Sequence, residues 1–155
     1  MDRFLSQFRN RIDAKGRLSL PAPYRAILSQ PGFEGVFLHP SLDDPALDGG
    51  GQGLVDEIQA MLDAMPLYSR EREDLATALL STGEVLRLDS EGRVSLPERL
   101  RVAAQLADEA LFAGQGRKFQ IWAPDRFAAR LDEARARARA TRAEFAARMA
   151  KGARA

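Results

Sequence analysis

The sequence contains no cysteine and only one histidine among its 155 residues. Without cysteine the chain cannot form a disulfide framework, a thiolate nucleophile or a zinc–thiolate site. A single histidine leaves little scope for imidazole-based metal binding or acid–base catalysis. The residues that most enzymes use are therefore nearly absent, and we expect a protein that is not an enzyme and needs no cofactor.

Long apolar runs are also missing. No stretch approaches the ~18–20 apolar residues that a membrane-spanning helix needs, and the first residues lack the basic-then-apolar pattern of a secretory signal. The apolar share of 45% and the near balance of 23 Lys and Arg against 22 Asp and Glu are typical of a globular domain. We therefore expect a cytoplasmic protein with no membrane partner.

The net charge of +1 conceals an uneven distribution along the chain. Residues 1–25 carry six basic and two acidic side chains, and residues 125–155 carry nine basic and four acidic ones. The segment between them carries eight basic and sixteen acidic side chains. This uneven distribution is typical of a protein that offers one basic surface to a polyanion. The polyanion could be a nucleic acid, an anionic membrane or an acidic partner protein.

The most informative feature is an internal repeat: residues 13–25 return as residues 89–101, with seven of thirteen positions identical and no gap. Each copy begins with Asp-x-x-Gly, which predicts a turn, because Asp accepts hydrogen bonds from the following backbone and Gly allows positive φ. Alternating apolar residues before and after the turn predict two strands. Pro21 and Pro97 then open a helix at its first position, where the missing N–H costs nothing.

Outside the repeat, the pattern predicts two further strands, a loop and two helices. The β-rich runs lie within 32–40 and 116–124, and each is closed by a proline. The acidic, glycine-rich segment 43–53 has the composition of a flexible loop. Apolar residues at helical spacing predict helices over 54–65 and 70–80.

We expect the chain to be organised as two similar halves with helical additions. The halves cover 5–52 and 83–126, and because neither is large enough to be stable alone, we expect them to share one core. A helical connector, 54–81, joins them, and a basic C-terminal helix, 127–155, follows them. That helix has a narrow apolar stripe among many arginines, which allows packing in an oligomer or contact with a phosphate backbone. We favour the oligomer.

The arginines and aspartates of the two turns are the candidate functional residues. The planar guanidinium of Arg17 can bind a phosphate or the O6/N7 edge of guanine with two hydrogen bonds. The alternative is that Arg17 and Arg93 are structural, each paired with an aspartate of the neighbouring turn. Asp13 and Asp89 open the turns, and we interpret them as turn-capping groups.

Two residues that suggest other chemistry are expected to be structural. His39 precedes a proline at the end of a predicted strand, and without a second histidine it is a poor metal ligand. Trp122 could stack on a base, but it lies in the middle of a β-rich run, where tryptophan more often packs in the core.

The duplicated motif, Asp-x-[Lys/Glu]-Gly-Arg-[Leu/Val]-Ser-Leu-Pro-x-x-[Tyr/Leu]-Arg, resembles the AbrB/SpoVT swapped-hairpin DNA-binding domains. Two copies in one chain, with residues 114–122 after the second, resemble the MraZ family of transcriptional regulators, and this resemblance spans most of residues 1–125. It implies an α+β fold with a mainly β core. That core would be a pseudo-two-fold double-split β-barrel of the swapped-hairpin kind, built from the two intrachain repeats, with added helices.

The resemblance also implies a function: sequence-specific binding to double-stranded DNA at short direct repeats upstream of the division and cell-wall gene cluster. It further implies a homo-oligomer, expected to be a ring, associated with the nucleoid. Carried over to this chain, the DNA-contacting residues are Arg17 first, supported by Lys15, Arg9, Arg11 and Arg25. Because the second copy has Glu91 in place of Lys15, we expect its Arg93 and Arg101 to be structural.

A second interpretation is an antitoxin-like DNA-binding module whose helical extension binds a partner protein. Antitoxin relatives usually combine one copy of the motif with a disordered acidic tail. This chain has two copies and a basic tail, which favours the transcriptional regulator.

Overall fold

Each copy of the repeat folds as a strand, a tight turn, a second short strand and a helix, as the sequence predicts. The computed structural model describes residues 2–154. The first copy contributes β1 (Gln7–Arg11), β2 (Arg17–Ser19) and α1 (Ala22–Leu28). The second contributes β5 (Glu84–Leu86), β6 (Arg93–Ser95) and α4 (Glu98–Ala103). We predicted Pro21 and Pro97 at the first helical position, but they occupy the N-cap positions of α1 and α4, one residue earlier.

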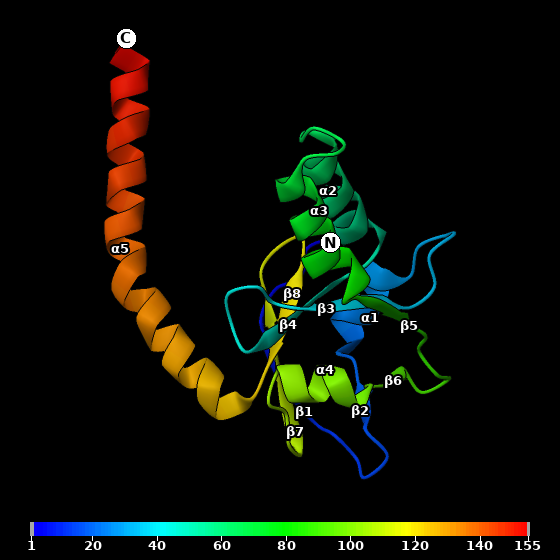
Figure 1. Ribbon diagram of the computed structural model, residues 1–155. Coiled ribbons are helices and arrows are strands. Elements are labelled where there is room, and N and C mark those ends of the chain that lie inside the picture. Colours follow the sequence, from blue (N-terminus) through cyan, green and yellow to red (C-terminus); the bar gives the residue numbers. More distant parts are fainter. Residues whose placement is uncertain (1, 155) are drawn as a thin grey trace. The chain divides into compact units, whose positions relative to one another are not determined.

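The strands form two sheets in which the halves of the chain interleave (Figure 1). The larger sheet also contains β3 (Val36–Pro40), β4 (Ala46–Gly50), β7 (Glu109–Gly114) and β8 (Phe119–Trp122), and its order is β1-β7-β8-β4-β3-β5. All of its pairings are antiparallel. β1 and β5 are its edges, and within residues 2–154 no pairing joins them into a closed barrel. The fold is therefore α+β with a mainly antiparallel β core.

The prediction of a flexible loop over 43–53 is wrong, because this segment contains β4, a buried strand between β3 and β8. Two of its glycines, Gly49 and Gly50, are required by close packing. A Cβ atom at Gly49 would lie 2.6 Å from the ring of Phe119 and 2.7 Å from the side chain of Leu38, and one at Gly50 would lie 2.8 Å from Cβ of Leu54. Glycine here lets neighbouring side chains approach the backbone closely.

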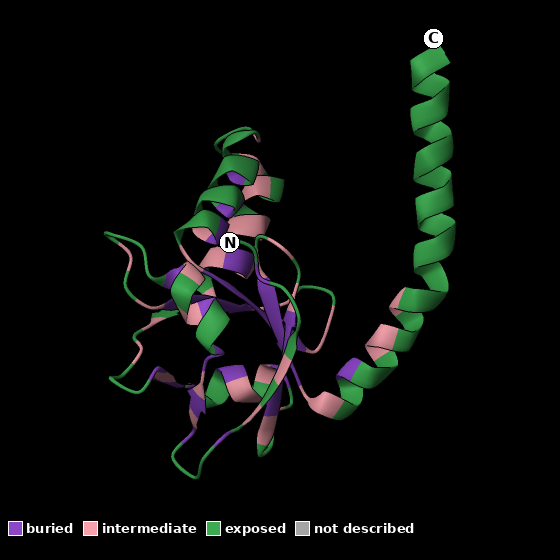
Figure 2. Ribbon diagram, turned by 180° about the vertical axis from the view of Figure 1, so that it is seen from behind, coloured by how far each residue is buried: buried purple, intermediate pink, exposed green. Residues whose placement is uncertain are grey.

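The two halves share one hydrophobic core, as expected. Tyr24 from the first half lies at its centre, with ring centroids 5.0 Å from those of Phe4 and Phe119 and 6.0 Å from that of Phe112. The hydroxyl of Tyr24 donates to the backbone carbonyl of Leu5 at 3.0 Å. Figure 2 shows that buried residues concentrate on the strands of the part that ends at Pro124.

The helical connector packs through a second, smaller apolar cluster. It consists of α2 (Gln52–Asp63), α3 (Arg70–Ala76) and a π-helical turn, η1 (Thr77–Ser81). Leu54, Ile58 and Leu62 from α2 meet Leu79 from η1 and Phe37 from β3. These contacts place the predicted helices of the connector over the β core.

The chain divides into two compact units, one that ends at Pro124 and one that begins at Asp125. The second unit is formed by the long helix α5 (Pro124–Arg154), which is exposed over most of its length. Among residues 2–154, no helix has both the length and the apolar character needed to cross a membrane.

Candidate nucleic-acid interface

The two turns of the repeat have the same hydrogen bonds. In the first, Oδ1 of Asp13 accepts from the backbone N–H groups of Lys15 and Arg17, both at 2.9 Å, and the N–H of Gly16 donates to the Asp13 carbonyl at 2.9 Å. In the second, Asp89 accepts from the corresponding residues, also at 2.9 Å. Gly16 and Gly92 have φ of 77° and 78°, a conformation that favours glycine. Aspartate and glycine thus fix each turn locally.

These bonds explain the acidity of both aspartates. The backbone N–H of Arg17 is the largest contribution that lowers the pKa of Asp13 below its usual value, and the N–H of Arg93 does the same for Asp89. Hydrogen bonds to a carboxylate favour its charged form. Both turns therefore hold an ionised aspartate at neutral pH.

Strands β2 and β6 join the two turns in one two-stranded ribbon. The register pairs Arg17 with Ser95, Leu18 with Val94, and Ser19 with Arg93. Leu18 and Val94 are buried in the core. Because successive side chains alternate between the faces of a strand, Arg17 and Arg93 share the opposite, outward face.

Each end of the ribbon is closed by the turn of the other half. The N–H of Leu20 donates to the carbonyl of Gly92 at 3.0 Å, and the N–H of Leu96 donates to the carbonyl of Gly16 at 2.9 Å. Figure 1 shows the two turns at opposite ends of the β2–β6 ribbon, the first at the bottom of the view and the second at its right. The repeat thus produces one surface with two related turns, which we call the ribbon face.

Each turn arginine pairs with the aspartate of its own turn. Nε of Arg17 lies 2.6 Å from Oδ2 of Asp13, and Nε of Arg93 lies 2.8 Å from Oδ2 of Asp89. Arg93 also lies 3.4 Å from the carboxylate of Glu91. The hydrogen bond with Asp89 raises the pKa of Arg93, with smaller contributions from the charges of Asp89, Glu91 and Asp13.

The electrostatic surroundings of the two turns therefore differ. The first turn has Lys15 and Arg17 against one carboxylate, whereas the second has Arg93 against two. Lys15 is exposed. A polyanion that approaches the ribbon face is attracted by the first turn and meets an additional negative charge at the second.

The arginine that ends each motif lies against the turn of the other half. A Cβ atom at Gly92 would lie 2.6 Å from Cδ of Arg25, and one at Gly16 would lie 3.4 Å from Cζ of Arg101. Arg25 also donates to the carbonyl of Leu20 at 2.5 Å. Arg101, which the sequence assigns to the second copy, is therefore the arginine beside the first turn, and Arg25 lies beside the second.

The arginines of β1 are on another face of the molecule. Asn10 reaches β2, where its Nδ2 donates to the carbonyl of Ser19 at 2.7 Å. Arg9 and Arg11 alternate with Asn10 along the strand and so point to its other face. Nη1 of Arg9 lies 3.9 Å from Glu109 on the adjacent strand. The structure thus brings Lys15 and Arg17 together at the first turn and leaves Arg9 and Arg11 apart from them.

The remaining polar groups of interest have structural partners. His39 is buried, with Nε2 3.7 Å from Oδ2 of Asp48, whose Oδ1 accepts from Gln120 at 2.9 Å. Trp122 is buried as expected and donates to Oε1 of Gln120 at 2.9 Å. Among residues 2–154, no group of three or more His, Cys, Asp or Glu side chains is placed to hold a metal ion.

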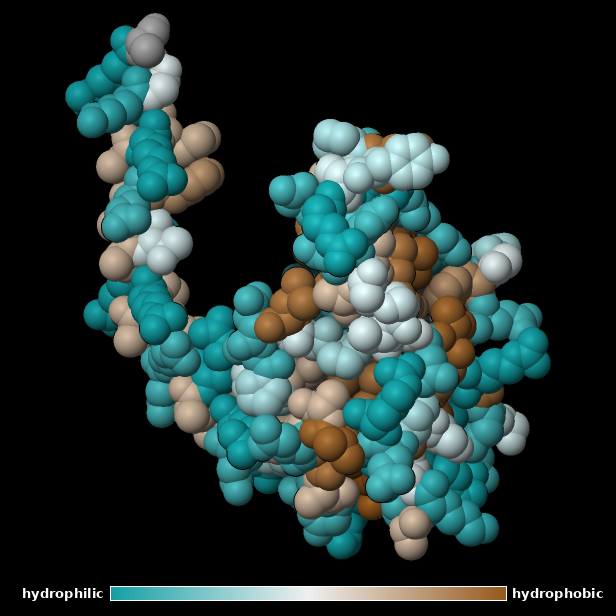
Figure 3. Space-filling model, viewed as in Figure 1, coloured by the Kyte–Doolittle hydropathy of each residue, from teal (hydrophilic) through white to brown (hydrophobic). Residues whose placement is uncertain are grey.

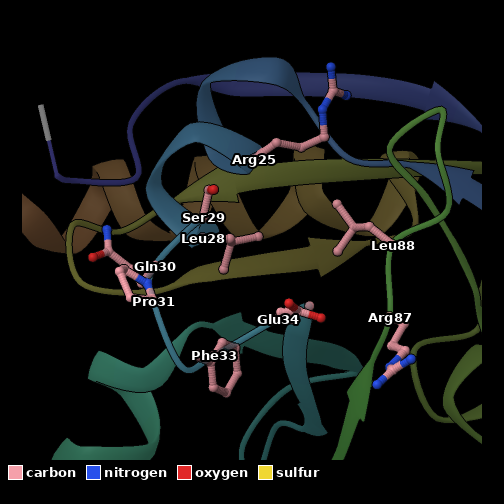
Figure 4. Close-up of a pocket in the computed structure, with 10 residues that line it drawn as sticks. Arg25, Leu28, Ser29, Gln30, Pro31, Phe33, Glu34, Arg87 and Leu88 are labelled. Carbon is pink, nitrogen blue, oxygen red and sulfur yellow. The ribbon is translucent and has the colours of Figure 1, made fainter.

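An open cleft of about 640 Å³ lies between the end of α1 and the segment after β5. Figure 4 shows Leu28 and Leu88 facing its interior, with Phe33 and Glu34 on another side, while the guanidinium of Arg25 points away from Glu34. The lining is a mixture of apolar and isolated polar side chains. Arg25 lines the cleft and also lies against Gly92 of the second turn.

Comparison with known proteins identifies a matching family and similar relatives. A family model described as "MraZ protein, putative antitoxin-like" matches residues 79–149. A protein of Beijerinckia indica named "Transcriptional regulator MraZ" is 52% identical over 148 residues, which are 96% of this chain and 90% of the relative. Proteins of the same name from Methylocella silvestris and Azorhizobium caulinodans are 49% and 52% identical and cover 97% and 92% of this chain, with 92% and 90% of each relative matched.

Proposed function

This chain belongs to the MraZ family, and we propose that it is a non-enzymatic transcriptional regulator that binds double-stranded DNA through the ribbon face. The observation that carries the proposal is the pair of related turns, which presents Arg17 and Arg93 on the outward face of the β2–β6 ribbon. The major groove of B-DNA accepts a two-stranded β-ribbon, and arginine can bind guanine or phosphate with two hydrogen bonds. Specific contacts and phosphate contacts are therefore available on one surface.

Within this surface we propose that the first turn makes the main DNA contacts. Lys15 and Arg17 are the contacting residues, because together they leave a positive charge beside Asp13. Arg101 lies against Gly16 and supports the turn. Arg93, held by Asp89 and Glu91, has a structural role, since both carboxylates compete with phosphate for its guanidinium.

The proposal includes the finer fold of the AbrB/SpoVT-like domains, the double-split β-barrel of swapped hairpins. Its support is that β2 pairs with β6 of the other half rather than forming a continuous hairpin ladder with β1. In this arrangement the two intrachain repeats form the two halves of the barrel, which single-copy relatives form by dimerisation.

The biological target in this proposal is a set of short direct repeats upstream of the division and cell-wall gene cluster, bound by a homo-oligomer in the cytoplasm, at the nucleoid. One turn with two basic side chains supplies few contacts for tight binding. Several protomers on successive repeats gain affinity through effective concentration. Oligomerisation, expected as a ring, is thus part of the mechanism.

A mobility-shift assay on the DNA immediately upstream of the protein's own gene tests this function. We expect a shifted complex that resists scrambled competitor of equal length and composition and weakens as salt is raised, because phosphate contacts release counterions. Equal competition by specific and scrambled DNA would refute sequence-specific regulation. An antitoxin-like function, which the description of the matched family mentions, additionally requires a partner protein that binds α5.

A further inference from the structure

Helix α5 carries an apolar stripe that is half-buried at Leu131 and Ala134 and exposed toward the C-terminal end of the helix. Residues spaced by three and four positions line one side of the helix, and we call this set the α5 seam: Leu131, Ala134, Ala138, Thr141, Phe145 and Met149. Phe145 and Met149 are each 62% exposed. Figure 3 shows apolar side chains projecting from one side of α5 between hydrophilic ones. Large apolar side chains at this spacing and exposure indicate a surface that packs against a partner.

Arginines border the α5 seam on both sides. At 100° per residue, one margin of the seam carries Arg130, Arg137 and Arg148. The other margin carries Arg135, Arg139 and Arg142. Pairing with a second α5 in parallel would place arginines of the two helices opposite one another, which is unfavourable. A phosphate backbone would neutralise the arginines but leave Phe145 and Met149 in water. The seam therefore fits a surface with an apolar centre and acidic margins.

Such a surface lies at the turn between α2 and α3. Met61, Leu67 and Tyr68 are 43%, 58% and 86% exposed, and we call this group the connector tip. Residues 52–76, which contain it, carry six acidic and two basic side chains. Figure 1 shows the turn projecting from the unit beyond both helices. The connector tip thus gives an apolar centre on a helix pair of net negative charge, in which Asp63 pairs with Arg72, and Arg70 pairs with Glu73 and Asp74.

We propose that the α5 seam of one copy docks on the connector tip of a second copy. This inference rests on the homo-oligomeric regulator proposed above and names the contact that builds the oligomer. The contact is head-to-tail, because one copy contributes a helix face and the other a helical turn. Every copy can then donate one seam and receive another, and repetition of the contact produces a closed ring or an open chain.

Two variants of the full-length protein test the contact by complementation. The seam variant carries Phe145→Ser with Met149→Ser, and the tip variant carries Leu67→Ser with Tyr68→Ser. All four side chains are exposed, so the fold should be retained. In sedimentation velocity we expect assemblies for the parent protein, and for each variant alone at least tenfold weaker association, close to the 17.1 kDa monomer.

The mixture gives the decisive result. The seam variant keeps an intact tip and the tip variant keeps an intact seam, so an equimolar mixture should form a two-chain species and nothing larger. A mixture that stays monomeric, variants that assemble like the parent protein, or a parent protein that is monomeric at all concentrations would each overturn the proposal. Leu42→Ser, which truncates a leucine of 56% exposure outside both surfaces, serves as the matched control and should assemble normally.

Binding to a duplex with a single repeat separates this inference from the proposed function. Neither variant touches Lys15 or Arg17, so both should bind that duplex within about twofold of the parent protein while losing the avidity seen on several repeats. If the two variants complement each other but the protein binds no DNA specifically, the contact between copies is supported and the proposed function as a transcriptional regulator is refuted. Normal binding to several repeats by both monomeric variants would contradict the role of the contact in the oligomer.

Discussion

Replacing Arg17 with alanine removes the central side chain of the proposed DNA contact with little effect on the turn. Oδ1 of Asp13 accepts from the backbone N–H groups of Lys15 and Arg17, and both groups remain in the variant. The loss is therefore confined to the guanidinium, which lies on the outward face of the ribbon. The substitution also removes Nε of Arg17, which lies 2.6 Å from Oδ2 of Asp13. The carboxylate of Asp13 then loses this ion pair and repels phosphate.

We expect binding to weaken by about 1–3 kcal/mol per engaged protomer, which is the usual cost of losing one arginine contact. At 1.4 kcal/mol per factor of ten, this corresponds to roughly 5–150-fold in Kd on a duplex with one repeat. If Arg17 binds phosphate, the slope of log affinity against log salt should also flatten by about one unit. Fluorescence anisotropy at several salt concentrations measures both quantities, and Arg17→Ala with Asp13→Asn shows how much of the loss is repulsion from Asp13.

The matched control is Arg93→Ala, which changes the equivalent side chain of the other turn. Arg93 is held by Asp89 and Glu91, so we expect an unchanged salt slope and a lower thermal midpoint. The decrease should be small, because exposed ion pairs contribute up to about 1 kcal/mol. Equal loss of affinity in the two variants, with fold and assembly preserved, would show that both turns contact DNA and would refute the reasoning from Glu91.

Three further predictions concern stability. Gly49→Ala should destabilise the fold by about 1–3 kcal/mol in chemical denaturation, since its Cβ would lie 2.6 Å from the ring of Phe119, whereas Gly53→Ala, with nothing within 4 Å, should be neutral or slightly stabilising. Burial raises the pKa of Tyr24 to about 12 from 10.0. Between pH 10 and 12 the folded state therefore keeps a proton that the unfolded chain releases, and the free energy of unfolding should fall as the pH rises. This fall should be less steep in Tyr24→Phe. Hydrogen bonds lower the pKa of Asp89 below 3.8. The contribution of the ionised Asp89 to the stability of the fold should therefore be complete above pH 3.8 and be lost at lower pH. In thermal melts, the melting temperature of Asp89→Asn should depend less on acid pH than that of the parent protein.

Local chemistry made much of the fold predictable. The Asp-x-x-Gly turns, the short strands after them and the helices that follow Pro21 and Pro97 depend on bonds within a few residues. The β4 segment could not be predicted in the same way. Gly49 and Gly50 resemble loop residues in the sequence, and their role follows from Phe119, Leu38 and Leu54, which approach only after the halves have interleaved.

The site shows the same division between local and long-range information. The turn and its capping bonds follow from residues 13–17 alone. Which arginine supports which turn depends on the exchange of strands between the halves, so Arg25 lies against Gly92 and Arg101 against Gly16. Two sequence signals pointed to this exchange: the duplication, because a repeat whose halves share one core can form contacts between copies, and the resemblance of the motif to swapped-hairpin domains.

The most direct test of the ribbon face uses the absence of cysteine, which lets a single introduced cysteine carry a photo-crosslinker. Ala14→Cys places the probe on the exposed first turn, Ser90→Cys on the second, and Arg11→Cys on the outer face of β1. Irradiated with DNA from upstream of its own gene, the protein should crosslink strongly from position 14, less from position 90, and not from position 11. Strong crosslinking from position 11 with none from position 14 would contradict the claim that this protein reads DNA through the ribbon face.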